Sequence, residues 1–208
     1  MKKYSYVGVA FIILIFGIYV IPKIVANIKT HELVTIGKVP EFKYTNQEGE
    51  SISNSFYENK VYVIEFFFTT CPTICPIMNE NMVKIQNEFY GNIDFGIASF
   101  SINPEYDTPE ILKEYAKNNA VTSKNWNFLT GDKTSIYSFA NKGLALYAGE
   151  NSEAEGGFEH SGMFALIDKN GNIRSRFDEN GNPIAFYDGL EDTSIKQLIE
   201  DIKILLKE

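Results

Sequence analysis

One run of eight residues, 61–68, constrains the fold of this chain more than any other segment. It reads VYVIEFFF, and β-branched and aromatic side chains of this kind favour a β-strand. The apolar residues follow one another almost without interruption, which is typical of a strand buried on both faces. We therefore expect this segment to be the central strand of a sheet.

The segments around this strand predict further strands that alternate with helices. Pro76 suits the first turn of a helix, and apolar residues follow it at helical spacing. Residues 107–110 combine an N-cap candidate, a proline and an acid, which indicates a second helix reaching to about residue 119. The remaining expected elements are an opening hairpin near residue 40, strands at 93–102, 126–129, 162–167 and 172–177, and a C-terminal helix at 194–206. This order predicts an α/β sandwich with a mixed sheet.

The composition fits one compact domain and excludes one class of partner. Hydrophobic residues make up 44% of the 208 residues and aromatic residues 14%, which argues against a disordered or repeat protein. Lysine and arginine number 19 against 27 aspartate and glutamate residues, giving a net charge of -8. Because this balance does not supply the phosphate-neutralising surface of nucleic-acid binders, we expect no nucleic-acid partner.

The N-terminus carries an apolar segment that can just span a bilayer. Residues 4–21 are eighteen residues without a formal charge, preceded by Lys2 and Lys3. A cleaved secretory signal and an uncleaved anchor both fit, and the lack of a clear A-x-A cleavage pattern favours the anchor. The positive-inside rule places the remainder on the extracytoplasmic (periplasmic) side of the cell (inner) membrane. We expect a single-pass transmembrane helix at residues 1–21, a juxtamembrane linker at 22–38 and the domain at 39–208.

The two cysteines of the chain, Cys71 and Cys75, stand four residues apart between the predicted central strand and a helix N-terminus. The positive end of a helix stabilises an anion, so a thiol there tends to be acidic and works as a nucleophile or a soft metal ligand. Pro72 and Pro76 keep the residue before each of them out of the α region, which predicts a loop for both cysteines. A structural disulfide is an alternative, but the spacing is wider than C-x-x-C and favours joint binding of a metal at least as much as redox chemistry.

Histidine is rare in this chain, which makes the position of each histidine informative. His31 lies in the expected linker, whereas His160 stands just before the predicted strand 162–167. The polar stretch 149–157 before it can deliver the imidazole to the sheet edge that carries the cysteines. Two thiolates and one imidazole suit copper in both of its oxidation states, because sulfur favours Cu(I) and nitrogen supports Cu(II).

Four further residues could take part in such a site. Met78 and Met82 continue the face of the cysteines at helical spacing, and we interpret both as core residues. Glu159 and Asp107 are candidates for groups that orient the imidazole. For Asp107, the N-cap of the following helix is the favoured interpretation.

At this point the motifs resemble those of the Sco/SenC family, the copper proteins that serve assembly of the copper centre of cytochrome c oxidase. Residues 68–76, FTTCPTICP, are similar to the family's F-T-x-C-P-x-x-C-P signature. Residues 103–110, NPEYDTPE, are similar to its D-P-x-x-D-T-P-E segment, and residues 159–161, EHS, fall where the family has D-H-S. Asn103, Glu159 and Thr73 depart from the family's residues.

The resemblance implies a thioredoxin-like fold, an N-terminal anchor, and Cys71, Cys75 and His160 as ligands of one copper ion, Cu(I) or Cu(II), per chain. It implies a metallochaperone that delivers copper to the copper-receiving subunit of cytochrome c oxidase, served by another copper chaperone or a thiol reductase. The alternative is a thiol-disulfide oxidoreductase that keeps the oxidase's copper-ligand cysteines reduced through Cys71 and Cys75. A peroxidase is disfavoured because no peroxidase nucleophile motif is present. Whether the chain is an enzyme therefore depends on which function holds.

Overall fold

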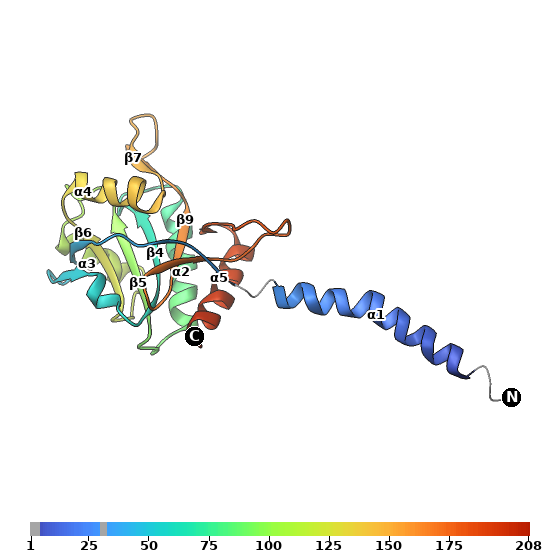
Figure 1. Cartoon of the computed structure of the whole chain (residues 1–208). Coiled ribbons are helices and arrows are strands. Elements are labelled where there is room, and N and C mark those ends of the chain that lie inside the picture. The colour runs from blue at the N-terminus through green and yellow to red at the C-terminus, as the bar shows by residue number, and fades with distance from the viewer. Residues whose placement is uncertain (1–4, 30–32) are drawn as a thin grey trace.

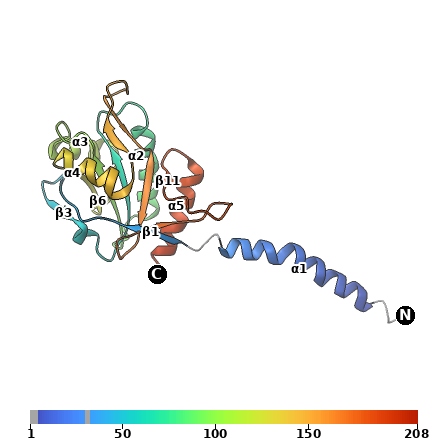
Figure 2. The same cartoon turned by 45° about the horizontal axis from the view of Figure 1, so that its top comes forward.

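The computed structural model describes residues 5–29 and 33–208 of the chain. Its globular part is built on one mixed sheet with helices packed around it (Figure 1, Figure 2). The strands lie in the order β1-β10-β9-β4-β5-β6-β2-β3, and β11 pairs with β9. Their bounds are β1 Val34–Lys38, β2 Lys43–Asn46, β3 Ser51–Ser53, β4 Val61–Phe67, β5 Phe95–Ser101, β6 Trp126–Thr130, β9 Met163–Ile167, β10 Asn172–Ser175 and β11 Tyr187–Asp188. This confirms the predicted α/β architecture.

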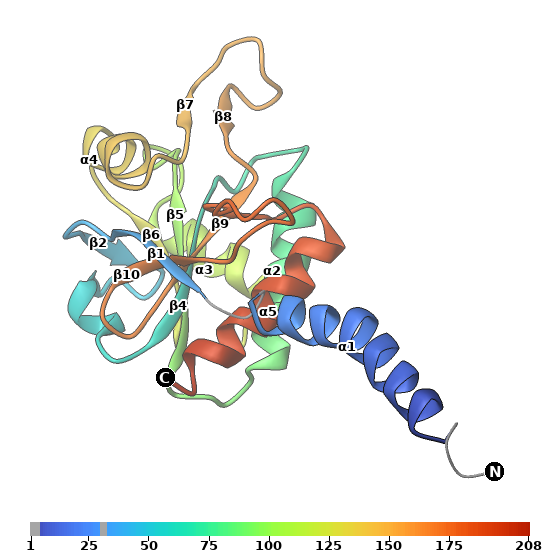
Figure 3. The same ribbon diagram turned by 45° about the vertical axis from the view of Figure 1, so that its right-hand side comes forward.

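The helices connect and cover these strands. Helix α2 joins β4 to β5, α3 joins β5 to β6, and α5 closes the chain and packs against α2. Figure 3 shows α2 and α5 side by side on one side of the sheet, with the α4 segment apart from them. The helical bounds are α1 Ser5–Lys29, η1 Asn54–Tyr57, α2 Cys75–Glu88, α3 Pro109–Asn118, α4 Lys133–Ser138, η2 Phe139–Leu144 and α5 Asp192–Leu205.

Strand β4 lies at the centre of the sheet, as its sequence predicts. All of its residues are buried, and it pairs in parallel with β5 and antiparallel with β9. Neighbouring side chains point to opposite faces. Phe66 therefore packs toward Phe139 of η2, with ring centroids 6.2 Å apart, whereas Phe67 packs against Tyr115 of α3 at 5.4 Å. Because this packing holds both faces of β4, the position of the chain directly after Phe67 is fixed.

Two elements lie inside residues 22–38, the segment expected to be a linker. Helix α1 continues to Lys29, and strand β1 pairs antiparallel with β10, with Val34 opposite Ser175. The sheet therefore begins before residue 39. The sequence of β1 gave little sign of this, because an edge strand with mostly exposed or half-buried residues has no strong apolar pattern.

Helix α1 extends away from the globular part (Figure 1), and most of its large apolar side chains between residues 6 and 21 are exposed. Over the described ranges, no helix combines the length and apolar character that crossing a membrane requires. The anchor at residues 1–21 stays a prediction, and its first four residues lie outside the described ranges.

A single acid, Glu65, interrupts the apolar run of β4 and is buried with it. Its carboxylate accepts a hydrogen bond from the Ser99 hydroxyl at 2.6 Å, and that hydroxyl accepts one from the Trp126 indole at 2.9 Å. Burial raises the pKa of Glu65 to about 7, although the bond from Ser99 and the charge of His160 oppose the shift. The folded protein thus holds this proton more tightly than the unfolded chain does.

We predict that Glu65 makes the protein less stable as the pH rises. Because its folded pKa lies above its unfolded value, its contribution is fully present below about pH 4.5 and is lost as the pH rises to about 7. The loss is on the order of 3 kcal/mol. Urea unfolding of the reduced, metal-free protein at pH 5 and pH 8 measures it. Glu65→Gln should remove this part of the pH dependence, and the exposed-site control Glu159→Gln should retain it. Equal pH dependence in wild type and Glu65→Gln would show that the account of Glu65 is wrong.

Candidate metal centre

The two cysteines follow directly from the buried strand β4. The Cys71 backbone N–H donates to the Phe68 carbonyl oxygen at 3.2 Å, which closes a turn over Thr69 and Thr70. Cys75 is the first residue of α2, so the expectation that both cysteines lie in a loop is correct for Cys71 only. Pro76 is tolerated after it because the first helical residues donate no intrahelical bond.

His160 reaches the cysteines from a small hairpin outside the main sheet. Strands β7 (Ala148–Glu150) and β8 (Phe158–His160) pair antiparallel, with Ala148 opposite His160. The Ser161 backbone N–H donates to the Tyr147 carbonyl oxygen at 2.9 Å, which holds the end of the hairpin. The polar stretch 149–157 is thus mostly the tip of a hairpin, and it does bring the histidine to the cysteine turn.

The three expected ligands meet at one point. The sulfur atoms of Cys71 and Cys75 and an imidazole nitrogen of His160 lie within 4.8 Å of one another, and all three residues are buried. The Cys75 sulfur and His160 Nε2 are 3.1 Å apart. Two sulfur donors and one nitrogen donor at these separations could hold a soft or borderline metal ion. Their role as ligands stays a prediction at this stage.

A backbone carbonyl, and not the expected acid, orients the imidazole. His160 Nδ1 lies 3.1 Å from the Ser161 carbonyl oxygen, which can only accept, so Nδ1 carries a proton and Nε2 faces the cysteines. The carboxylate of Glu159 instead accepts from the Asn151 side chain at 3.0 Å. The interpretation of Glu159 as the orienting group is therefore wrong, because successive residues of a strand point to opposite sides.

The favoured interpretation of Asp107 is also wrong. Thr108 is the N-cap of α3, and its side chain accepts from the Ile111 backbone N–H. Asp107 is fully buried and faces the cysteine turn: its carboxylate accepts bonds from the Thr69 backbone N–H, the Thr69 hydroxyl and the Ser101 hydroxyl. No bond joins it to the imidazole among the described residues.

The two thiols differ strongly in acidity. The neighbouring Cys75 side chain lowers the pKa of Cys71 to about 3. Burial opposes this shift, while His160 and the backbone at Cys75 and Thr73 add to it. The pKa of Cys75 is raised, first by the neighbouring Cys71 side chain and then by burial. One thiolate is thus ready to bind, and a metal that takes both sulfurs must displace a proton.

Residues that the sequence did not predict as part of the site also line it. The Thr73 hydroxyl lies 3.6 Å from the Cys71 sulfur, and the ring of Phe68 packs edge-on against His160 with centroids 6.0 Å apart. At the hairpin tip, Gly156 has a φ of +87°, and a Cβ there would lie 2.9 Å from Phe68. The hairpin therefore closes against the cysteine turn only because glycine occupies this position.

A cavity of about 380 Å³ opens onto the site between the cysteine turn and the hairpin. Cys71 and His160 lie in its wall, and Glu153, Glu155 and Glu159 line it from the hairpin side. Negative side chains around such an opening favour the approach of a cation.

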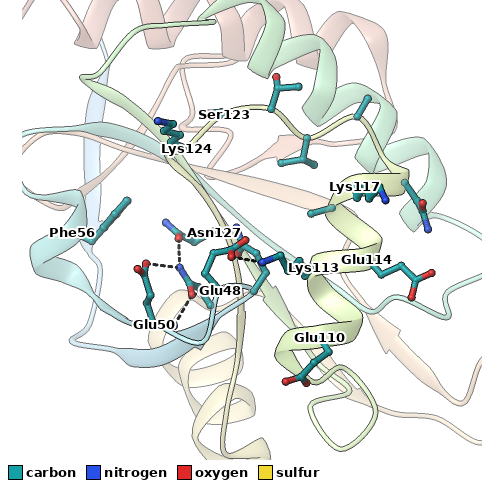
Figure 4. A pocket seen from close by; sticks show the side chains of 17 residues that line it. Glu48, Glu50, Phe56, Glu110, Lys113, Glu114, Lys117, Ser123, Lys124 and Asn127 are labelled. Carbon is teal, nitrogen blue, oxygen red and sulfur yellow. Dashed lines mark hydrogen bonds and ion pairs between the residues drawn. The ribbon is translucent and has the colours of Figure 1, made fainter.

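A larger cavity, of about 960 Å³, lies elsewhere, beside α3 and the β2–β3 turn (Figure 4). Some of its polar side chains are paired with one another: Lys113 with Glu48 at 2.5 Å, and Asn46 with Asn127 at 3.0 Å. Neither a cysteine nor a histidine lines it. This cavity offers no group suited to the predicted chemistry.

Both methionines near the cysteines belong to the core, as predicted. Met78 and Met82 are essentially inaccessible to solvent. His31, the other histidine of the chain, lies outside the described residues.

Comparison with known proteins identifies relatives of this chain. A family model described as SCO1/SenC matches residues 34–194. The SCO1 protein homolog of Bacillus subtilis is 33% identical over 168 residues, which cover 80% of this chain and 81% of that protein. Both matches include the cysteine turn and the hairpin.

Solved structures show the same fold. BsSco, described as a member of the Sco family of cytochrome c oxidase assembly proteins with a disulfide switch, is 31% identical with a TM-score of 0.69, over 84% of this chain and 96% of its own. ScoI of Bradyrhizobium japonicum, solved with copper bound, has a TM-score of 0.64 at 23% identity over 82% of this chain and 99% of its own, which shows the fold alone. With its helix-flanked mixed sheet matching these thioredoxin-like structures, and a family model that spans most of its length, the chain belongs to the SCO1/SenC family.

Proposed function

We propose that this chain is a metallochaperone that binds one copper ion through Cys71, Cys75 and His160 and delivers it to the copper-receiving subunit of cytochrome c oxidase. The observation that carries the proposal is the convergence of two sulfurs and one imidazole nitrogen within 4.8 Å. Another copper chaperone or a thiol reductase would act before it, to load or reduce the site.

The donor set favours copper over harder metals. Thiolate sulfur is a soft ligand that suits Cu(I), and imidazole nitrogen supports Cu(II), whereas magnesium and calcium require oxygen ligands. No carboxylate belongs to the group, which is the only one of its kind found across residues 5–29 and 33–208. One such group supports one copper per chain. Zinc also accepts two thiolates and an imidazole, so the experiment must compare the two metals.

Two relatives support the proposal, one by its bound copper and one by its family's role in oxidase assembly. ScoI of Bradyrhizobium japonicum holds copper within the same fold, and BsSco belongs to a family of cytochrome c oxidase assembly proteins. The cavity beside Cys71 and His160 also fits copper delivery, because a transferred ion must leave through an accessible side of the site.

A second candidate function is thiol-disulfide exchange. The lowered pKa of Cys71 and the nearby Cys75 sulfur favour it, since a low-pKa thiol beside a second thiol is the arrangement of dithiol reductases. In this function Cys71 and Cys75 would become a disulfide while a disulfide between the oxidase's copper-ligand cysteines is reduced to two thiols. His160 separates the two functions, because copper binding requires it and disulfide exchange does not.

We further propose that the N-terminal segment anchors the protein in the cell (inner) membrane, with the domain on the extracytoplasmic side. Support comes from the sequence, in which residues 4–21 carry no formal charge and two lysines precede them. An anchored donor would stay close to a membrane-bound oxidase.

Copper binding and its dependence on single residues can be measured directly. We predict one copper per chain, loss of Cu(I) retention in Cys71→Ala and Cys75→Ala, and at least about tenfold weaker Cu(II) binding in His160→Ala, because imidazole matters more to the harder ion. Metal analysis and competition titration of the reduced protein, with His31→Ala as control, check this. Zinc affinity equal to or above that of copper, or a His160→Ala variant unchanged in both copper forms, would contradict the proposal.

Copper and a Cys71-Cys75 disulfide should exclude each other. Oxidation consumes both thiolates and leaves the imidazole without sulfur co-ligands, so the oxidised protein should lose Cu(I) binding and a reductant should restore it. Thiol counting beside copper titration on one sample tests this. Full copper occupancy in protein without titratable thiols would refute it.

The anchor predicts that the full chain stays with membranes during alkaline extraction. A variant that lacks residues 1–29 serves as the soluble control. Recovery of the mature chain in the soluble fraction, with an N-terminus beyond residue 21, would instead indicate a cleaved signal.

A further inference from the structure

The turn that carries Cys71 is held by a buried acid on another part of the chain. Asp107 has no exposed surface, and its carboxylate accepts from the Thr69 backbone N–H at 3.1 Å and from the Thr69 hydroxyl. It also accepts from the Ser101 hydroxyl at 2.5 Å. Three donors thus converge on one carboxylate that lies in the segment between β5 and α3.

Thr69 is the first central residue of the turn that ends at Cys71. One bond within the turn, from the Cys71 N–H to the Phe68 carbonyl oxygen, closes it at 3.2 Å. Both donors of Thr69 are directed to Asp107, so this residue cannot rotate without breaking two bonds to a buried carboxylate. The position of the Cys71 sulfur therefore depends on a residue 36 positions further along the chain.

We propose that Asp107 is a positioning residue for the cysteine site: through Thr69 it fixes the turn that sets the Cys71 sulfur against Cys75 and His160. The carboxylate suits the task because it accepts from all three donors, whereas an amide would turn a donor toward one of them. A fixed turn raises the effective concentration of one sulfur at the other, and it presents both sulfurs to a metal in one arrangement. The proposal rests on the site that we propose for copper, but not on copper delivery.

The chain offers matched variants for the test. Thr69→Val is nearly isosteric and removes the hydroxyl bond on the cysteine side of Asp107. Ser101→Ala removes a bond to the same carboxylate on the far side, together with the bond that its hydroxyl accepts from the Asn103 N–H, so it is the harsher change for the network. Asp107→Asn keeps the shape of the acid, and Asp201→Asn is its control, because Asp201 is equally buried and bonds to Arg176 and Tyr187 instead.

The readout is the equilibrium of the metal-free full chain with glutathione. Two thiols and one glutathione disulfide give the Cys71-Cys75 disulfide and two glutathione thiols, so atoms and electrons balance. Thr69→Val and Asp107→Asn should lower this equilibrium constant about tenfold, which raises the midpoint potential by about 30 mV. Their Cu(I) affinity should also fall about tenfold. This is the smallest loss expected when a residue that supports a metal ligand is replaced. Asp201→Asn should stay within about twofold of wild type in both measurements, and Ser101→Ala should shift them less than Thr69→Val does.

Urea unfolding of every variant separates positioning from general stability. If Asp107→Asn fails to fold, the glutathione equilibrium and the Cu(I) affinity of Thr69→Val test the proposal without it. Thiol equilibria within twofold of wild type in Thr69→Val, or equal shifts in Thr69→Val and Ser101→Ala, would overturn the proposal. If wild type itself fails to bind copper, the proposed function is wrong, and the glutathione equilibrium still tests the role of Asp107.

Discussion

The burial of strand β4 on both faces is the constraint on which the rest of the structure depends. A strand fixed between α3 on one face and η2 on the other cannot shift its register without breaking the side-chain packing on both faces. Its last residues therefore deliver the turn with Cys71 to a defined place, and α2 begins there with Cys75. The same burial makes Glu65 an acid with a raised pKa beneath the site.

The site joins a local element to a distant one. Cys71 and Cys75 come from one turn, so sequence spacing alone keeps them near each other, but His160 comes from a hairpin 85 residues after Cys75. The pairing of β7 with β8 forms the hairpin. Two contacts place it against the cysteine turn: the packing of Phe68 on the imidazole and the fit of Gly156 against Phe68. A site assembled this way can admit a metal from the open side while its ligands keep their orientation.

Local patterns predicted most of the elements and the identity of the candidate ligands. The apolar run of β4, the prolines in the first turns of α2 and α3, and the rarity of cysteine and histidine are all visible in the sequence. The roles of Asp107 and Glu159 were not predictable, because each depends on which long-range partner the fold supplies. Asp107 is one residue before the true N-cap, and only the packing of β4 beside β5 brings Thr69 to it. Strand β1 was missed because an edge strand needs its partner to be recognised.

The central claim is that two sulfurs and one imidazole hold copper together. X-ray absorption spectroscopy at the copper edge, on the full chain loaded with one equivalent of copper and studied as Cu(I) and as Cu(II), tests it most directly. The account predicts two sulfur neighbours at about 2.3 Å, taking the zinc-thiolate distance as a guide, and one imidazole nitrogen at about 2.0 Å in the Cu(II) form. A copper environment of nitrogen and oxygen alone, or with a single sulfur, would contradict it.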